Sequence, residues 1–241
     1  MKLLAMDTSN QAVSVALLDD QQILGEMTVN IRQTHSQTLL PMVDQLLKQT
    51  QTAIETIDRF VVAEGPGSYT GLRIAVTTAK SFAWTLNKPL VGISSLALLA
   101  ANIVDTTALI VPLFDARRAN VFTGVYQWQS GSLQTVVADQ HVSIETLLAR
   151  LQLLAEPVYF VGNDVAHFKE ELQAALGSNA HFVGANHNLP HASVLGKLGL
   201  LAEPVADIHR FGPVYLRKTE AEVNWAKTHD ERGTESYVEQ V

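Results

Sequence analysis

Three consecutive polar residues, Asp7, Thr8 and Ser9, follow a short apolar run at the start of the chain. A carboxylate and two hydroxyls at the end of a buried strand can hold a nucleotide phosphate or a hydrated metal ion. The same side chains also serve as hydrogen-bond acceptors in ordinary Asx and Ser/Thr turns. The residues favour neither interpretation, so Asp7, Thr8 and Ser9 are candidates for a vestigial phosphate site.

A glycine-rich segment, GPGSYTG at residues 65–71, is the second candidate. It lies between a predicted strand and a predicted helix, and the N-terminus of a helix binds anions well. However, its spacing matches neither the dinucleotide-binding nor the Walker pattern, and no lysine follows the last glycine. We therefore favour a tight turn in which Ser68 or Thr70 caps the helix.

The second half of the chain offers weaker candidates. Asp115 ends an apolar run as Asp7 does, but residues 116–118 contain no glycine for close approach to a phosphate. His187 and His191 have the spacing of metal ligands on a helix, but a proline between them favours a loop. The serine-hydrolase pattern G-x-S-x-G is absent. These residues predict no catalytic group and no metal site.

Two predicted helices, over residues 36–50 and 70–86, are apolar around much of their surface. In the second, small residues recur every four positions at Gly71, Ala75, Ala79 and Ala83, which lets another helix approach closely. A helix that is apolar on most sides is either deeply buried or shared with a partner. The pattern leaves both alternatives open.

Both halves of the chain predict the order strand, strand, strand, helix, strand, helix. Strands are predicted over residues 2–7, 12–18, 23–31, 59–63, 90–93, 109–114, 120–128, 133–138 and 158–161. Further helices are predicted over residues 95–104, 143–154, 164–176 and 192–201. We expect two similar α/β lobes facing a cleft, with domains at 1–104 and 105–217 and a charged tail at 218–241.

Composition excludes several classes of protein. The 241 residues carry 24 acidic and 17 basic side chains, a formal charge of −7, and no cysteine. Disulfide scaffolds and thiolate zinc sites are therefore excluded. Unaided binding to nucleic acid is not expected, because phosphate-binding surfaces need clustered lysine and arginine. No apolar run is long enough to cross a membrane, so we expect a cytoplasmic protein.

Four segments resemble the bacterial TsaB family: MKLLAMDTSNQAVSVALL, EGPGSYTGLRIAVTTAKSFAW, KPLVGISSLALLA and YLRKTEAE. The resemblance runs from residue 1 to about residue 222 and is most specific in GPGSYTGLRI. It implies two lobes of the actin/hexokinase/Hsp70-like (ASKHA) fold. It also implies a role in making threonylcarbamoyladenosine beside the anticodon of tRNAs that read ANN codons.

The resemblance assigns catalysis to a paralog, TsaD, which holds a metal ion with two histidines. The corresponding positions here are about Ser95 and Leu99, and neither side chain replaces an imidazole. The resemblance thus implies no catalytic and no metal-binding residue in this chain. ATP or ADP and a metal ion are expected on the catalytic partner, and no cofactor on this chain alone.

The same resemblance implies that the two apolar helices bind the TsaD-like paralog, or form a homodimer when the chain is alone. A TsaE-like ATPase is expected in the same complex. We expect six residues near the centre of the partner contact: Leu39, Val43, Leu46, Arg73, Ile74 and Thr77. Ile74→Glu would then bury an unpaired carboxylate and prevent assembly.

Two alternatives belong to other functional classes. A self-sufficient ATPase or small-molecule kinase would use Asp7, Thr8 and Ser9, and ATP turnover by the isolated chain would favour it. A glycoprotease-like metallopeptidase would need metal ligands that Ser95 and Leu99 do not supply.

Overall fold

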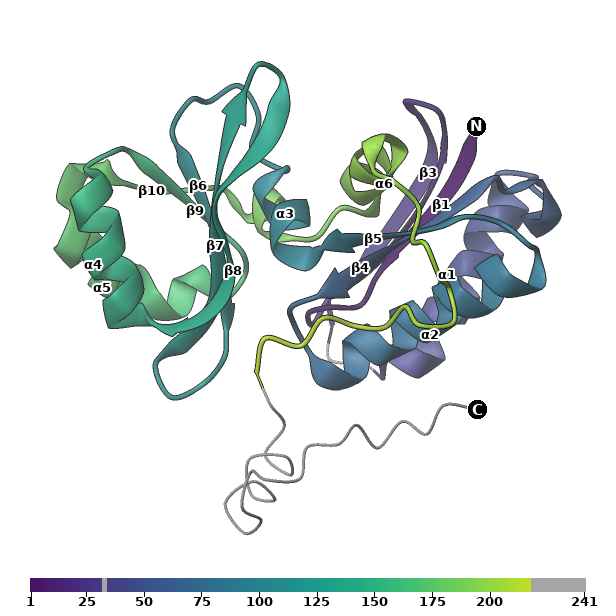
Figure 1. Ribbon diagram of the computed structural model, residues 1–241, viewed down its shortest axis with the longest axis horizontal. Helices are drawn as coiled ribbons and strands as arrows, with labels where there is room; N and C mark the ends of the chain where they lie inside the picture. The colour runs from purple at the N-terminus through teal and green to yellow at the C-terminus, as the bar shows by residue number, and fades with distance from the viewer. Residues whose placement is uncertain (32–33, 218–241) are drawn as a thin grey trace, which may run out of the picture.

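The protein is described by a computed structural model over residues 1–31 and 34–217, and the predicted charged tail at 218–241 lies outside these residues. Two five-stranded sheets, each with helices packed against it, form two lobes that lie side by side (Figure 1). The predicted α/β fold with two similar lobes is confirmed. No helix in the described residues combines the length and apolar character that crossing a bilayer requires.

The first sheet has the strand order β3-β2-β1-β4-β5. Its strands are β1 (Lys2–Asp7), β2 (Val13–Asp19), β3 (Gln22–Val29), β4 (Arg59–Gly65) and β5 (Leu90–Ser94). Strand β2 is antiparallel to both β1 and β3, whereas β4 and β5 extend the sheet in parallel with β1. Helices α1 (His35–Gln49) and α2 (Tyr69–Thr85) lie next to each other on one face of this sheet (Figure 1).

The second sheet repeats this arrangement, with the order β10-β9-β6-β7-β8. Its strands are β6 (Leu109–Asp115), β7 (Asn120–Gln129), β8 (Ser132–Ser143), β9 (Val158–Val161) and β10 (Ala180–Phe182), and its helices are α4 (Ile144–Leu154) and α5 (Val165–Leu176). The strand predicted over 133–138 is too short. A shift of register near Val125 lets β8 keep pairing with β7 as far as Ser143.

Two helices lie between the lobes and cover the inner faces of the sheets (Figure 1). Helix α3 (Ser95–Ala100) packs Leu96 and Leu99 against the second sheet, and it ends four residues before the predicted position. Helix α6 (Ala192–Leu201) comes from the second half of the chain, but it packs Leu195 against the first sheet. Each lobe therefore takes a helix from the other half of the sequence, and a domain boundary at residues 104–105 stays a prediction.

Strands β1 and β4 are buried on both faces because helices cover both sides of the first sheet. Leu4 and Phe60 pack toward α1 and α2, whereas Leu3 and Val61 pack toward α6. This explains why these strands are continuous apolar runs in the sequence rather than alternating ones. Short 3-10 turns connect the remaining elements at Ile54–Thr56, Gly177–Asn179 and Ala185–Asn188.

Candidate functional site

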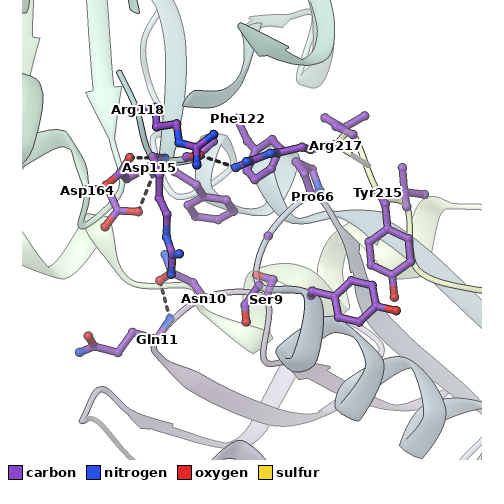
Figure 2. A pocket seen from close by; sticks show the side chains of 18 of the residues that line it. Ser9, Asn10, Gln11, Pro66, Asp115, Arg118, Phe122, Asp164, Tyr215 and Arg217 are labelled. Carbon is purple, nitrogen blue, oxygen red and sulfur yellow. Dashed lines mark hydrogen bonds between the residues drawn. The ribbon is translucent and has the colours of Figure 1, made fainter. Parts of the chain in front are cut away.

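A cleft of about 1000 Å³ lies between the lobes. The first lobe contributes residues 9–11 and 66–69 to its wall, and the second contributes residues 114–118, Phe122 and Asp164. Residues 214–217 also line the cleft. Figure 2 shows Ser9 and Asn10 on one side of this space and Asp115 and Arg118 on the other.

The predicted phosphate-site residues form a closed turn at the end of β1. Asp7 accepts a hydrogen bond from the Ser9 amide at 2.7 Å, and the Thr8 hydroxyl donates to the Gly71 carbonyl at 2.6 Å. Asp7 and Thr8 are fully buried, and of the three only Ser9 lines the cleft. The Ser9 Oγ atom is buried without a hydrogen-bond partner in the described chain. Of these three residues, only Ser9 thus reaches the wall of the cleft, and its hydroxyl oxygen is itself buried.

The glycine-rich segment packs its backbone directly on this turn. The Ser68 side chain caps α2 by accepting from the Gly71 amide at 3.3 Å, which confirms the predicted cap. The Ser68 amide in turn donates to the Ser9 carbonyl at 2.7 Å. A Cβ atom on Gly71 would lie 2.0 Å from the Thr8 carbonyl oxygen, and one on Gly67 would lie 2.2 Å from that of Ser9. These two glycines are thus explained by contact between two backbone segments.

The carboxyl of this turn, that of Asp7, has a pKa far from its usual value. Burial raises the pKa of Asp7 to about 6, although the hydrogen bond from the Ser9 amide opposes the shift. A carboxyl whose pKa is higher in the folded chain stabilises the fold when protonated, and this stabilisation is lost as the pH rises through the folded pKa.

Asp7→Asn is expected to remove part of the pH dependence of stability. Since the pKa of Asp7 is raised from its usual 3.8 to about 6, its ionisation costs the wild-type chain about 3 kcal/mol between pH 4 and pH 8. The asparagine keeps an oxygen for the Ser9 amide and carries no charge. As the pH rises, the free energy of unfolding of the variant, measured with urea at each pH, should therefore increase by about 3 kcal/mol relative to that of the wild type. The exposed variant Glu170→Gln is the control, and parallel curves for Asp7→Asn and the wild type would contradict this prediction.

The second lobe builds its side of the cleft from a hairpin turn after β6. Asp115 accepts from the Arg117 amide at 2.7 Å, and the Asp115 amide donates to Asp164 at 2.9 Å. Residues Arg117, Arg118 and Ala119 have φ angles of 66°, 53° and 55°, so the turn reaches the left-handed region without a glycine. Burial raises the pKa of Asp164. Carboxylates and arginines thus share this wall, and the Arg117 amide of the hairpin is bonded to Asp115.

The last described residue also contacts this hairpin. The Arg217 guanidinium donates to the Ala116 carbonyl at 3.0 Å, at the wall of the cleft (Figure 2). Nearby, the rings of Tyr69 and Tyr215 stack with their centroids 4.8 Å apart. Neither contact can be predicted from the sequence, because each joins residues that are far apart in the chain.

The positions compared with the paralog's metal ligands lie in the interior. Ser95 and Leu99 are 1% and 0% exposed, and Leu99 packs in the apolar cluster under the second sheet. A leucine side chain carries no ligand atom, so this pair does not fit a metal ion. No group of three or more His, Cys, Asp or Glu side chains suited to a metal ion occurs in residues 1–31 and 34–217.

The two histidines with metal-ligand spacing have structural partners. His187 lies in a short 3-10 turn, and its Nδ1 atom is 3.1 Å from the Asn102 carbonyl oxygen. His191 precedes α6, and its Nε2 atom is 2.9 Å from the Asn186 carbonyl oxygen. The predicted loop thus consists of a 3-10 turn and the residues that lead into α6. It contacts Asn102, which follows α3.

The six residues expected at a partner contact divide into two sets. Leu39, Val43 and Leu46 are at most 2% exposed and pack into the core between α1 and the first sheet. Their expected place at the centre of a contact needs correction, because in the single chain these side chains have no free surface. On α1 the exposed apolar side chain is Leu40, at 50%.

The α2 residues lie closer to the surface. Arg73 and Thr77 are exposed, and Ile74 is half-buried at the edge of the core. The Arg73 guanidinium donates to the Tyr69 hydroxyl and lies 5.1 Å from the centre of that ring. Trp84, near the end of α2, is 66% exposed. The outer surface of α2 therefore carries both apolar and cationic side chains.

The chain is similar in sequence and in fold to proteins that are already known. The family described as "TsaD: tRNA N6-adenosine threonylcarbamoyltransferase" matches residues 22–225. The "tRNA threonylcarbamoyladenosine biosynthesis protein TsaB" of Bacillus subtilis is 42% identical, over 95% of this chain and 99% of its own. The protein of the same name from Haemophilus influenzae is 27% identical, over 94% and 97%. A Pseudomonas aeruginosa crystal structure, described as similar to peptidase YeaZ, aligns with a TM-score of 0.75 and 30% identity over 90% of this chain and 99% of that one.

Proposed function

Because this chain belongs to the TsaB family of tRNA threonylcarbamoyladenosine biosynthesis proteins, we propose that it is the non-catalytic subunit of a threonylcarbamoyl-transferring complex. In this complex it binds a TsaD-like catalytic paralog and holds it in an active state. The complex forms threonylcarbamoyladenosine beside the anticodon of tRNAs that read ANN codons. This reaction takes place in the cytoplasm.

The observation that carries the non-catalytic role is the closed turn at the end of β1. Two polar groups that could face a phosphate, the Thr8 hydroxyl and the Ser68 amide, are instead bonded inside the protein to the Gly71 and Ser9 carbonyls. The glycines that could cradle a ligand instead let α2 approach this turn to within backbone contact. A kinase or ATPase that uses Asp7, Thr8 and Ser9 would have to open this packing first.

The partner contact is proposed on the outer surface of α1 and α2. Exposed Leu40 and half-buried Ile74 supply apolar area, and Arg73 supplies a guanidinium already oriented by Tyr69. Apolar side chains together with arginine are enriched at the centres of protein interfaces. Leu39, Val43 and Leu46 support this contact indirectly, because they pack α1 against the first sheet. The same surface would form a homodimer when the paralog is absent.

Nucleotide and metal chemistry is assigned to the other subunits of the complex. Leu99 offers no ligand atom, and the net charge of −7 does not favour direct tRNA binding by this chain. We therefore place ATP or ADP and the metal ion on the TsaD-like subunit, and ATP turnover on a TsaE-like ATPase.

Reconstitution with purified components tests this proposal. Threonylcarbamoyl transfer to an ANN-decoding tRNA is expected only when this chain, the TsaD-like paralog and the TsaE-like ATPase are combined. Omitting this chain should reduce the product at least about tenfold, and this chain alone should form none and hydrolyse no ATP. Equal product without this chain would refute the activating role, and ATP hydrolysis by the isolated chain would favour the kinase or ATPase alternative.

A further inference from the structure

The segment that follows α6, residues 203–217, forms no helix or strand, and we call it the C-terminal arm. It passes along α2 toward the second lobe (Figure 1). The Lys80 ammonium group of α2 donates to the Phe211 carbonyl of the arm at 2.7 Å. The Val214 amide of the arm donates to the Glu64 carbonyl of β4 at 2.7 Å. These hydrogen bonds fix the arm against α2 and the first sheet.

The arm places a tyrosine ring against the first turn of α2. The rings of Tyr215 and Tyr69 stack, with centroids 4.8 Å apart and an angle of 27° between their planes. The Arg73 guanidinium lies 5.1 Å from the centre of the same Tyr69 ring and donates to the Tyr69 hydroxyl. Tyr69 therefore contacts both the arm and an arginine one helical turn farther along α2. We call Tyr69, Arg73 and Tyr215 the tyrosine–arginine cluster.

The tyrosine–arginine cluster lies at the surface although it carries large apolar rings. Tyr69 and Tyr215 are 43% and 42% exposed, the neighbouring Val214 is 43% exposed, and Arg73 is exposed as well. Apolar side chains that stay exposed next to one another mark sites of interaction more often than isolated ones do. Tyrosine and arginine are also enriched at the centres of protein interfaces, where they contribute much of the binding energy. The composition of the cluster therefore favours a contact with another protein.

Arg73 presents N–H donors that no carboxylate in the described part of the chain uses. Its hydrogen bond to the Tyr69 hydroxyl occupies one of the five donors of a guanidinium. No ion pair joins Arg73 to an aspartate or glutamate of the described residues, whereas exposed Arg210 of the arm pairs with Asp207 at 3.5 Å. A guanidinium binds a planar carboxylate through two parallel hydrogen bonds, and its orientation by Tyr69 reduces the entropy lost on binding. The cluster thus fits a carboxylate that the described residues do not supply.

We propose that the tyrosine–arginine cluster binds an aspartate or glutamate side chain of the TsaD-like paralog, and that apolar side chains of this partner pack on the two tyrosine rings. This inference rests on the proposed function and extends its partner contact from α1 and α2 onto the C-terminal arm. The two surfaces are continuous, because Arg73 belongs to α2 and contacts the Tyr69 ring on which Tyr215 stacks. Tyr215 is a positioning residue, since it supports the tyrosine that orients the guanidinium.

Titration calorimetry of the full chain with the TsaD-like paralog tests the role of Arg73. Arg73→Gln is expected to weaken binding about tenfold or more, because it removes charge-assisted hydrogen bonds. Added salt should weaken binding of the wild type more than that of Arg73→Gln. Lys169→Gln is the matched control, because the Lys169 ammonium group lies 5.2 Å from the centre of the Phe182 ring in the second lobe. It also removes a cation over a ring, and its affinity should equal that of the wild type.

Variants of Tyr215 test whether the arm supports Arg73. Tyr215→Ala removes the stacked ring and is expected to weaken binding roughly fivefold, whereas Tyr215→Phe keeps the ring and should recover most of this loss. Because Tyr215 acts in part through Arg73, the double variant should bind less weakly than the product of the two single effects predicts. A ring that only stabilised the fold would give effects that multiply.

Unchanged affinity in Arg73→Gln, or effects that multiply in the double variant, would overturn the proposal. Ile74→Glu separates this failure from a failure of the proposed function, because Ile74 lies on α2 outside the tyrosine–arginine cluster. If Ile74→Glu prevents binding while Arg73→Gln binds as the wild type does, the contact on α2 stands and the role of the cluster is wrong. If both variants bind as the wild type does, the proposed partner surface is wrong as well.

Discussion

Ile74→Glu is expected to abolish binding of the TsaD-like paralog while the chain stays folded. Ile74 is half-buried at the edge of the core on α2, so a glutamate there can reach solvent in the free chain. In a complex over this surface the carboxylate would be buried without a partner, which costs about 3 kcal/mol or more. This corresponds to an affinity at least about a hundredfold weaker, measurable by titration calorimetry and by light scattering after size exclusion.

Matched variants separate lost contact from lost folding. Thr77→Arg lies one helical turn along α2 on an exposed position, so it leaves the core intact and should also weaken the complex. Glu170→Arg, exposed on α5 of the second lobe, adds the same side chain away from the proposed surface and should bind normally. Wild-type affinity in both α2 variants would show that the partner binds elsewhere.

Gly71→Ala is expected to destabilise the chain by roughly 3 kcal/mol or more. Within a helix this change is normally favourable by about 1 kcal/mol. Here the new Cβ atom would lie 2.0 Å from the Thr8 carbonyl oxygen, and backbone cannot move aside as a flexible side chain can. Either α2 shifts away from β1, or the bond from the Thr8 hydroxyl to the Gly71 carbonyl breaks.

Urea unfolding measures this loss as a lower midpoint at an unchanged slope. Gly212→Ala is the matched control, because nothing lies within 4 Å of its Cβ position and its backbone is not left-handed. Its stability should stay within about 0.5 kcal/mol of the wild type. A Gly71→Ala chain as stable as this control would mean that α2 does not press on the turn at the end of β1.

Local patterns were sufficient to predict most of the elements. The Ser68 cap of α2 follows from a serine placed three residues before Gly71, and the order of strands and helices follows from periodicity. The predicted length of a strand was wrong where pairing with the neighbouring strand, rather than the apolar pattern, decided where it ends. Strand β8 extends beyond the apolar residues at 133–138 because β7 continues to pair with it past the register shift. Helix α3 stops at Ala100 although the apolar pattern continues.

The sequence could not decide what covers an apolar surface. The stripe of Leu39, Val43 and Leu46 suits a partner helix or the chain's own sheet equally well, and the fold uses it for the sheet. Likewise, nothing in residues 192–201 tells that α6 covers the first sheet. Hydrophobic burial has no direction of its own, so its partner is selected only when the whole chain packs.

By itself, the sequence determined the element order, the family and the capped glycine-rich turn, because each depends on neighbouring residues or on motif spacing. Only the tertiary structure decided that the glycines of this turn press on Thr8 and Ser9, and that the ring of Tyr69 stacks on that of Tyr215. Tyr69 and Tyr215 are far apart in the sequence. Contacts of this kind form only when the whole chain packs, and no local pattern of residues encodes them.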